Sequence, residues 1–141
     1  MDEPLRSNRD LWDAWTKIHL ESAFYDVASF RSGQHPIRLR DYEIEEVGSV
    51  AGRSLLHLQC HFGLDSLSWA RLGADVTGAD FSEAAISAAR GLAADLALPA
   101  RFVLGNVYEL PGALEGEFDI VYTSRGVLGW LPDIVAWARV A

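Results

Sequence analysis

The stretch that decides the fold is Ser54-Leu-Leu-His-Leu-Gln-Cys-His-Phe-Gly-Leu-Asp-Ser-Leu-Ser-Trp-Ala70. It begins as an apolar run typical of a buried strand, passes through a tight turn that ends at Gly63, and continues with helical spacing. A second strand pattern follows and leads to Asp80. A turn between a first strand and a helix, with an acid after the next strand, indicates a nucleoside-cofactor site.

Strand and helix patterns alternate through the rest of the chain. We expect strands at 53–58, 75–79, 101–104 and 118–123, helices at 64–72 and 83–97, and a last helix that starts near Asp133. This alternation predicts an α/β fold with a parallel sheet and helices on both of its faces. A ligand should then lie beyond the carboxyl ends of the strands.

The N-terminal segment has a different, helical pattern. A helix is expected at 8–28 with Ser7 or Asn8 as its cap, then a loop at 30–36 and a short acidic helix at 38–47. We therefore divide the chain into a helical extension or lid at 1–50 and a sheet domain at 51–141.

This order of parts resembles the class I S-adenosylmethionine-dependent methyltransferases. In that family the first strand ends in an acid, which is followed by a Gly-x-Gly-x-Gly turn. Here His57 stands at the acid's position, and the glycine positions hold Gln59, His61 and Gly63. Because glutamine and histidine favour negative φ, we expect the shape of this turn to differ from the family's. The resemblance implies a Rossmann-like sheet of strand order 3-2-1-4, S-adenosylmethionine as cofactor, and methyl transfer to a small molecule.

The resemblance also implies which residues bind the cofactor. Asp80 would accept from the ribose hydroxyls, Asp65 would meet the methionine ammonium group, and Asn106 would accept from the adenine amino group. The full set of expected cofactor-binding residues is His57, Gln59, Cys60, His61, Gly63, Asp65, Asp80, Phe81, Asn106, Val107 and Ser124. Three of these roles have a plain alternative: Asp80 as a helix-start residue, Asp65 as a partner of the helix dipole, and Asn106 as a turn residue.

Four further residues are candidates for binding the methyl acceptor: Trp12, Trp15, His19 and Arg125. Arg125 follows the fourth expected strand and could bind a carboxylate or phosphate, or be solvated. Aromatic residues at helical spacing more often serve packing than binding. We expect no catalytic acid or base, since positioning supplies most of the effect in methyl transfer from a sulfonium.

Composition narrows the classes of partner and location. The chain has 141 residues, a net charge of −8 and a pI near 4.8, which disfavours nucleic-acid binding. It has neither an apolar run of membrane-spanning length nor the pattern of a signal peptide, and a single cysteine favours the cytoplasm. A zinc site at His57, Cys60 and His61 would lack a fourth ligand, so we expect no metal.

Two other functions remain possible on the sequence. A nicotinamide oxidoreductase needs glycines at the first, third and sixth turn positions, which here are Gln59, His61 and Leu64. A non-catalytic, truncated binding or interaction unit is the stronger alternative, because the sequence stops inside a helical pattern at 134–141 and the family's further strands are missing. In that case the strand at 118–123 would be an exposed edge through which the chain associates with itself.

Overall fold

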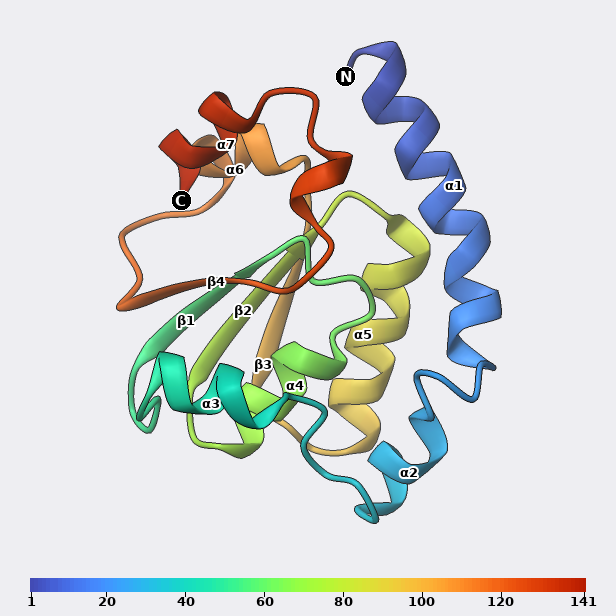
Figure 1. The fold of residues 1–141 in the computed structure, drawn as a ribbon, viewed down its shortest axis with the longest axis vertical. Coiled ribbons are helices and arrows are strands. Elements are labelled where there is room, and N and C mark those ends of the chain that lie inside the picture. Colours follow the sequence, from blue (N-terminus) through green and yellow to red (C-terminus); the bar gives the residue numbers. More distant parts are fainter.

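Four parallel strands form the centre of the computed structural model, which describes residues 1–141 (Figure 1). The strands are β1 (Ser54–Leu58), β2 (Asp75–Asp80), β3 (Ala100–Leu104) and β4 (Ile120–Thr123). Their order in the sheet is β3-β2-β1-β4, and every neighbouring pair is parallel. The predicted α/β class and the predicted strand order are both confirmed.

The register of the strands brings their carboxyl ends to one edge of the sheet. Leu58 at the end of β1 lies opposite Ala79 of β2 and Thr123 of β4, and Asp80 lies opposite Leu104 of β3. Most of β1 and β2 is buried, as expected for the central strands of a parallel sheet that is covered on both faces. The loops after all four strands therefore open towards the same end of the molecule.

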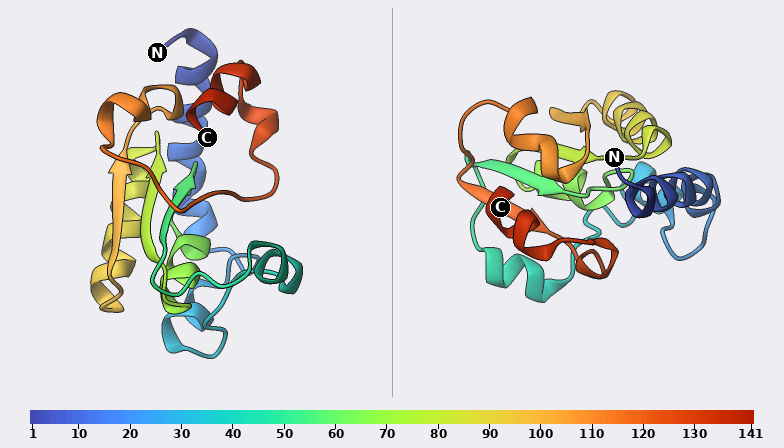
Figure 2. Two further views of the ribbon diagram at one scale, coloured as in Figure 1. Left: turned by 90° about the vertical axis from the view of Figure 1, so that its left-hand side faces the viewer. Right: turned by 90° about the horizontal axis from the view of Figure 1, so that it is seen from above.

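Helices cover both faces of the sheet, as the views in Figure 2 show. On one face α4 (Leu64–Arg71) and α5 (Glu83–Asp95) bury an apolar layer that includes Leu67, Ile86 and Phe102. On the other face Leu56 and Leu58 pack under the short helices η1 (Val107–Glu109) and α6 (Leu110–Ala113). The end of the chain adds η2 (Leu128–Trp130) and α7 (Ile134–Val140), and side chains of α7 pack against this second layer.

The N-terminal segment differs from the expectation of one helix at 8–28, which is wrong. It forms α1 (Glu3–Leu20), a turn, α2 (Val27–Ser32) and α3 (Asp41–Val47). The first helix starts early because the side chain of Asp2 accepts a hydrogen bond from the N–H of Leu5, 3.2 Å away. Asp26 caps α2 in the same way, so the loop expected at 30–36 begins only after Ser32.

Candidate functional site

The turn after β1 carries three residues with positive φ. Gln59, His61 and Gly63 have φ angles of 56°, 53° and 82°. These are the three positions at which the resembled family has glycine, and the expectation of negative φ at Gln59 and His61 is wrong. Each left-handed residue other than glycine costs about 1–2 kcal/mol, which other contacts must offset.

Backbone hydrogen bonds fix this turn against the neighbouring strand. The N–H of Cys60 donates to the carbonyl of Ala79 at 2.9 Å, and the N–H of Gly63 donates to the carbonyl of Cys60 at 3.0 Å. The N–H of His61 donates to a carboxylate oxygen of Asp80 at 2.8 Å. These bonds hold Gln59 and His61 in a conformation that their own local preference does not favour.

Gly63 fills the third position for a steric reason as well. A Cβ atom added there would lie 2.8 Å from two ring carbons of the buried Phe102. Gly116 has a similar φ, +78°, but a Cβ atom added to it would meet nothing within 4 Å. A substitution at Gly116 therefore causes backbone strain alone, whereas the same substitution at Gly63 causes both backbone strain and overpacking.

Gly63→Ala is expected to lower the free energy of unfolding by about 1–3 kcal/mol more than Gly116→Ala, because only the first change forces a methyl group into a packed core. Urea unfolding of the two variants and the unmodified chain measures this difference. Equal losses in the two variants would show that Phe102 simply moves aside.

Asp80 is a buried carboxylate whose two oxygens are both held by the backbone. One oxygen accepts from His61 N–H at 2.8 Å, and the other accepts from Ser82 N–H at 2.9 Å. Burial raises the pKa of Asp80, and these amide bonds oppose that rise. Each carboxylate oxygen can accept a second hydrogen bond, so Asp80 keeps two oriented acceptors for a ligand.

His57 is fully buried beneath the turn. Its Nδ1 lies 2.6 Å from the hydroxyl oxygen of Ser66 on α4, and its Nε2 has no partner in the protein. Burial lowers the pKa of His57 to about 3, so the ring is neutral at physiological pH. The side-chain oxygen of Gln59 is likewise buried without a partner. Two polar atoms at this site thus have unused hydrogen-bonding capacity, which a bound molecule can satisfy.

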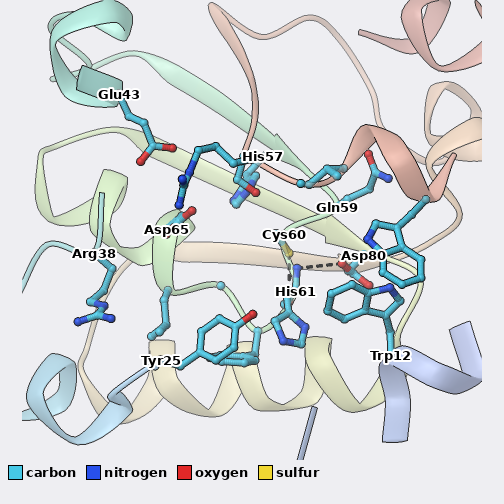
Figure 3. A pocket seen from close by; sticks show the side chains of 18 of the residues that line it. Trp12, Tyr25, Arg38, Glu43, His57, Gln59, Cys60, His61, Asp65 and Asp80 are labelled. Atoms are coloured by element: carbon cyan, nitrogen blue, oxygen red, sulfur yellow. Dashed lines mark hydrogen bonds between the residues drawn. The ribbon is translucent and has the colours of Figure 1, made fainter. Parts of the chain in front are cut away.

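Helix α1 closes one side of the site, as Figure 3 shows for Trp12. The ring of Trp12 lies 5.1 Å from that of His61, and His61 Nε2 lies 3.0 Å from His19 Nδ1, so one imidazole donates to the other. Trp12 also packs edge-on against Trp130 of η2, at 5.3 Å between ring centroids. Asp13 accepts a hydrogen bond from the hydroxyl of Ser82, at the start of α5.

These elements enclose a cavity of about 470 Å³. Nine of the eleven expected cofactor-binding residues line it: His57, Gln59, Cys60, His61, Gly63, Asp65, Asp80, Phe81 and Ser124. Trp12 and Arg125, from the acceptor set, line it too.

Four expected site residues lie elsewhere. Asn106 lines a neighbouring cavity that shares Phe81 with the first, and its side-chain oxygen accepts from the N–H of Tyr108. Val107 is buried in the apolar layer under α6. Trp15 packs against Trp12 and Trp130. His19 does not line the cavity, but it contacts the lining residues Trp12, Tyr25 and His61.

The end of the cavity away from Asp80 is strongly charged, and most of its residues were not expected from the sequence. Arg38 and Arg40 come from the segment before α3, and Glu43 comes from α3 itself. Asp65 lies at the start of α4, and Figure 3 shows it with Arg38 and Glu43. Burial, with Glu43 nearby, raises the pKa of Asp65 to about 6, while the arginines oppose the rise. A cavity with opposite charges at this end and a carboxylate at the other suits a polar ligand that carries both signs of charge.

Fold and site together define an α/β protein with a nucleoside-cofactor turn. A sequence profile described as a methyltransferase domain matches residues 55–140. The chain therefore belongs to this family, the class I S-adenosylmethionine-dependent methyltransferases, whose cofactor is S-adenosylmethionine.

Individual relatives agree with the family match. The chain is 37% identical over 99 residues to the ubiquinone biosynthesis O-methyltransferase of Alkalilimnicola ehrlichii, covering 70% of this chain and 39% of that protein. The enzyme of the same name from Cronobacter sakazakii is 33% identical over 133 residues, covering 92% and 54%. A solved structure from work on the conversion of a disulfide bond into a thioacetal group during echinomycin biosynthesis is 34% identical, with a TM-score of 0.60, covering 70% and 42%. The chain thus spans between two fifths and about half of the length of these relatives.

Proposed function

We propose that this chain binds S-adenosylmethionine in the cavity beside the turn and serves methyl transfer to a small molecule. The observation that carries this proposal is the pairing of Asp80, with two oriented acceptors, and a charged cavity end on opposite sides of the same turn. The cofactor supplies an electrophilic methyl group on a sulfonium. The chain's own residues bind and orient it.

The ribose would lie at Asp80. Its two hydroxyls find an acceptor in each carboxylate oxygen, and the amides of His61 and Ser82 keep those oxygens in place. The adenine would lie against Phe81, which separates the main cavity from the one lined by Asn106. Val107 remains part of the proposed adenine site through its backbone N–H.

The methionine part would lie at the charged end. Asp65 has no hydrogen-bond partner in the protein and can accept from the ammonium group. Arg38 is half-buried, donates to the carbonyl of Phe24 at 3.1 Å, and keeps further N–H groups for the carboxylate. The unpartnered Nε2 of His57 and side-chain oxygen of Gln59 belong to residues that line the same cavity, which fits a polar, hydrogen-bonding ligand.

The roles of the remaining parts follow from this placement. Residues 1–50 would act as a lid, which the contacts of Trp12 and His19 with the turn support, and 51–141 would be the cofactor-binding domain. The names of the curated relatives favour an oxygen atom as methyl acceptor.

A cytoplasmic location is supported by the single, buried cysteine. The structure contains no helix with both the length and the hydropathy that a membrane span requires.

Calorimetric titration tests the proposal. S-adenosylhomocysteine, the demethylated product, is expected to bind this chain, and NAD is expected not to bind. The reverse preference would replace the methyltransferase proposal with a nicotinamide-dependent one. Binding of neither compound would favour a non-catalytic interaction unit.

Self-association through the outer edge of β4 is also proposed. In this structure β4 pairs only with β1, and Val121 is exposed on it. An edge strand with unpaired backbone groups tends to pair with another chain. We expect sedimentation of the 141-residue chain to show dimers or larger species, and Val121→Lys to shift the population towards monomer. A monodisperse monomer of the unmodified chain would contradict this.

A further inference from the structure

Three charged side chains that line the main cavity make no hydrogen bond or ion pair within the protein: Arg40, Asp65 and Arg125. The other charged groups of the lining are engaged. Asp80 accepts from two amides, and Glu43 accepts from the N–H of Arg40 and from the hydroxyl of Tyr122. The guanidinium of Arg38 donates to a backbone carbonyl.

The two free guanidinium groups reach the same end of the cavity from distant parts of the chain. Arg40 immediately precedes α3, and Arg125 follows β4. Both are close enough to Asp65 to lower its pKa, and both are exposed, so they stand at the mouth rather than at the base of the cavity. Two arginines at the mouth of one cavity stand out on a chain whose net charge is −8.

The proposed cofactor does not need Arg40 or Arg125 as a partner. Under the proposed function, Asp65 takes the ammonium and Arg38 takes the carboxylate of the methionine part. The sulfonium then leaves the bound cofactor with one net positive charge. Positive charge from the cofactor and from two unpaired arginines favours an anion in the rest of the cavity, where partial exclusion of water strengthens the attraction.

We propose that the methyl acceptor carries an anionic group, a carboxylate or a phosphate, which Arg40 and Arg125 bind at the mouth of the cavity. Guanidinium groups suit such oxyanions because they can donate two parallel hydrogen bonds. The acceptor's nucleophilic atom would then point inward, past Ser124, towards the turn. This inference rests on the proposed function and adds the class of substrate to it.

Binding measurements test the inference without any need for turnover. The chain, saturated with S-adenosylhomocysteine, is titrated by calorimetry with two matched pairs of aromatic probes, chosen because Trp12, Tyr25 and Trp130 line the cavity. One pair is 3,4-dihydroxybenzoate and catechol, and the other is phenyl phosphate and phenol. The anionic member of at least one pair is expected to bind at least tenfold more tightly, since charge-assisted hydrogen bonds are each worth about that factor or more.

Matched variants assign the preference to the two arginines. Arg40→Gln and Arg125→Gln should each reduce the preference to threefold or less and leave the affinity for S-adenosylhomocysteine within twofold. Arg53→Gln changes the net charge equally but lies at the opposite end of the sheet, just before β1, and should retain the full preference. Thermal unfolding should be the same for all three variants, because the three arginines are exposed.

Several outcomes would overturn this inference and leave the proposed function intact. They are equal affinities within both pairs, no binding of any probe to the cofactor-loaded chain, or an anion preference that survives both cavity substitutions. A parallel loss of S-adenosylhomocysteine affinity in the Arg40 and Arg125 variants would assign these residues to the cofactor's carboxylate instead. Failure of the unmodified chain to bind S-adenosylhomocysteine would overturn the proposed function, and this inference with it.

Discussion

Asp80→Ala is expected to weaken the binding of S-adenosylhomocysteine at least tenfold and to lower the free energy of unfolding by about 2 kcal/mol or more. The first effect follows from the loss of two charge-assisted hydrogen bonds to the ribose, each worth about 1.5–3 kcal/mol. The second follows from the structure, in which the carboxylate accepts from the amides of His61 and Ser82. Without it, two buried donors have no acceptor, at a cost of about 1–3 kcal/mol each.

The control is Asp75→Ala, at the exposed start of the same strand, β2. It removes the same side chain from the other end of the sheet and should change neither the affinity nor the stability beyond about 0.5 kcal/mol. Calorimetry gives the dissociation constants, and urea unfolding gives the stabilities. A destabilised Asp80→Ala variant that still binds with the original affinity would assign Asp80 to holding the turn and to nothing else.

Acid is expected to destabilise the chain through His57. The unfolded state takes up a proton on this residue below about pH 6.5, whereas the folded state keeps it neutral down to about pH 3. Between these values the unfolded state binds more protons, so stability falls as the pH falls. The contribution of His57 decreases by about 1.4 kcal/mol per pH unit, which is about 2 kcal/mol by pH 5.

His57→Asn isolates this contribution. The asparagine amide can take the place of Nδ1 next to Ser66, but it does not titrate. His61, whose pKa is also lowered, and Asp65 and Asp80, whose pKa values are raised and act in the opposite direction, are present in both proteins. The stability difference between the original chain and the variant should therefore shrink by about 2 kcal/mol from pH 7 to pH 5. A constant difference would mean that His57 binds its proton equally well when folded.

The sheet could be predicted from the sequence because its signals are local. Apolar runs place each strand within about two residues, and Ser82 caps α5 as expected by accepting from the N–H of Ala85 at 3.1 Å. The single helix expected at 8–28 was wrong because the stop after Leu20 has no glycine or proline to mark it. The hydroxyl of Ser22, which accepts from the N–H of Tyr25, instead forms a turn there.

The rest of the candidate site depends on long-range contacts that no local pattern reveals. Positive φ at Gln59 and His61 is held by bonds to residues of β2, about twenty positions further along the chain. Arg38, Arg40 and Glu43 read as a solvated start of an acidic helix, and only the packing of α3 brings them to the cavity. Asn106 and Val107 were expected from the resemblance to the family, which does not specify how Phe81 divides the space between two cavities.

The imidazole of His61 has a consequence that a glycine at its position could not have. Its backbone N–H holds the Asp80 carboxylate, and its ring holds His19 of α1, so one residue connects the cofactor's proposed ribose acceptor with the helix above it. The undocking of α1 and the loss of order at Asp80 are therefore energetically coupled. By linkage, a ligand that stabilises the turn favours the docked helix to the same extent that the docked helix favours the ligand.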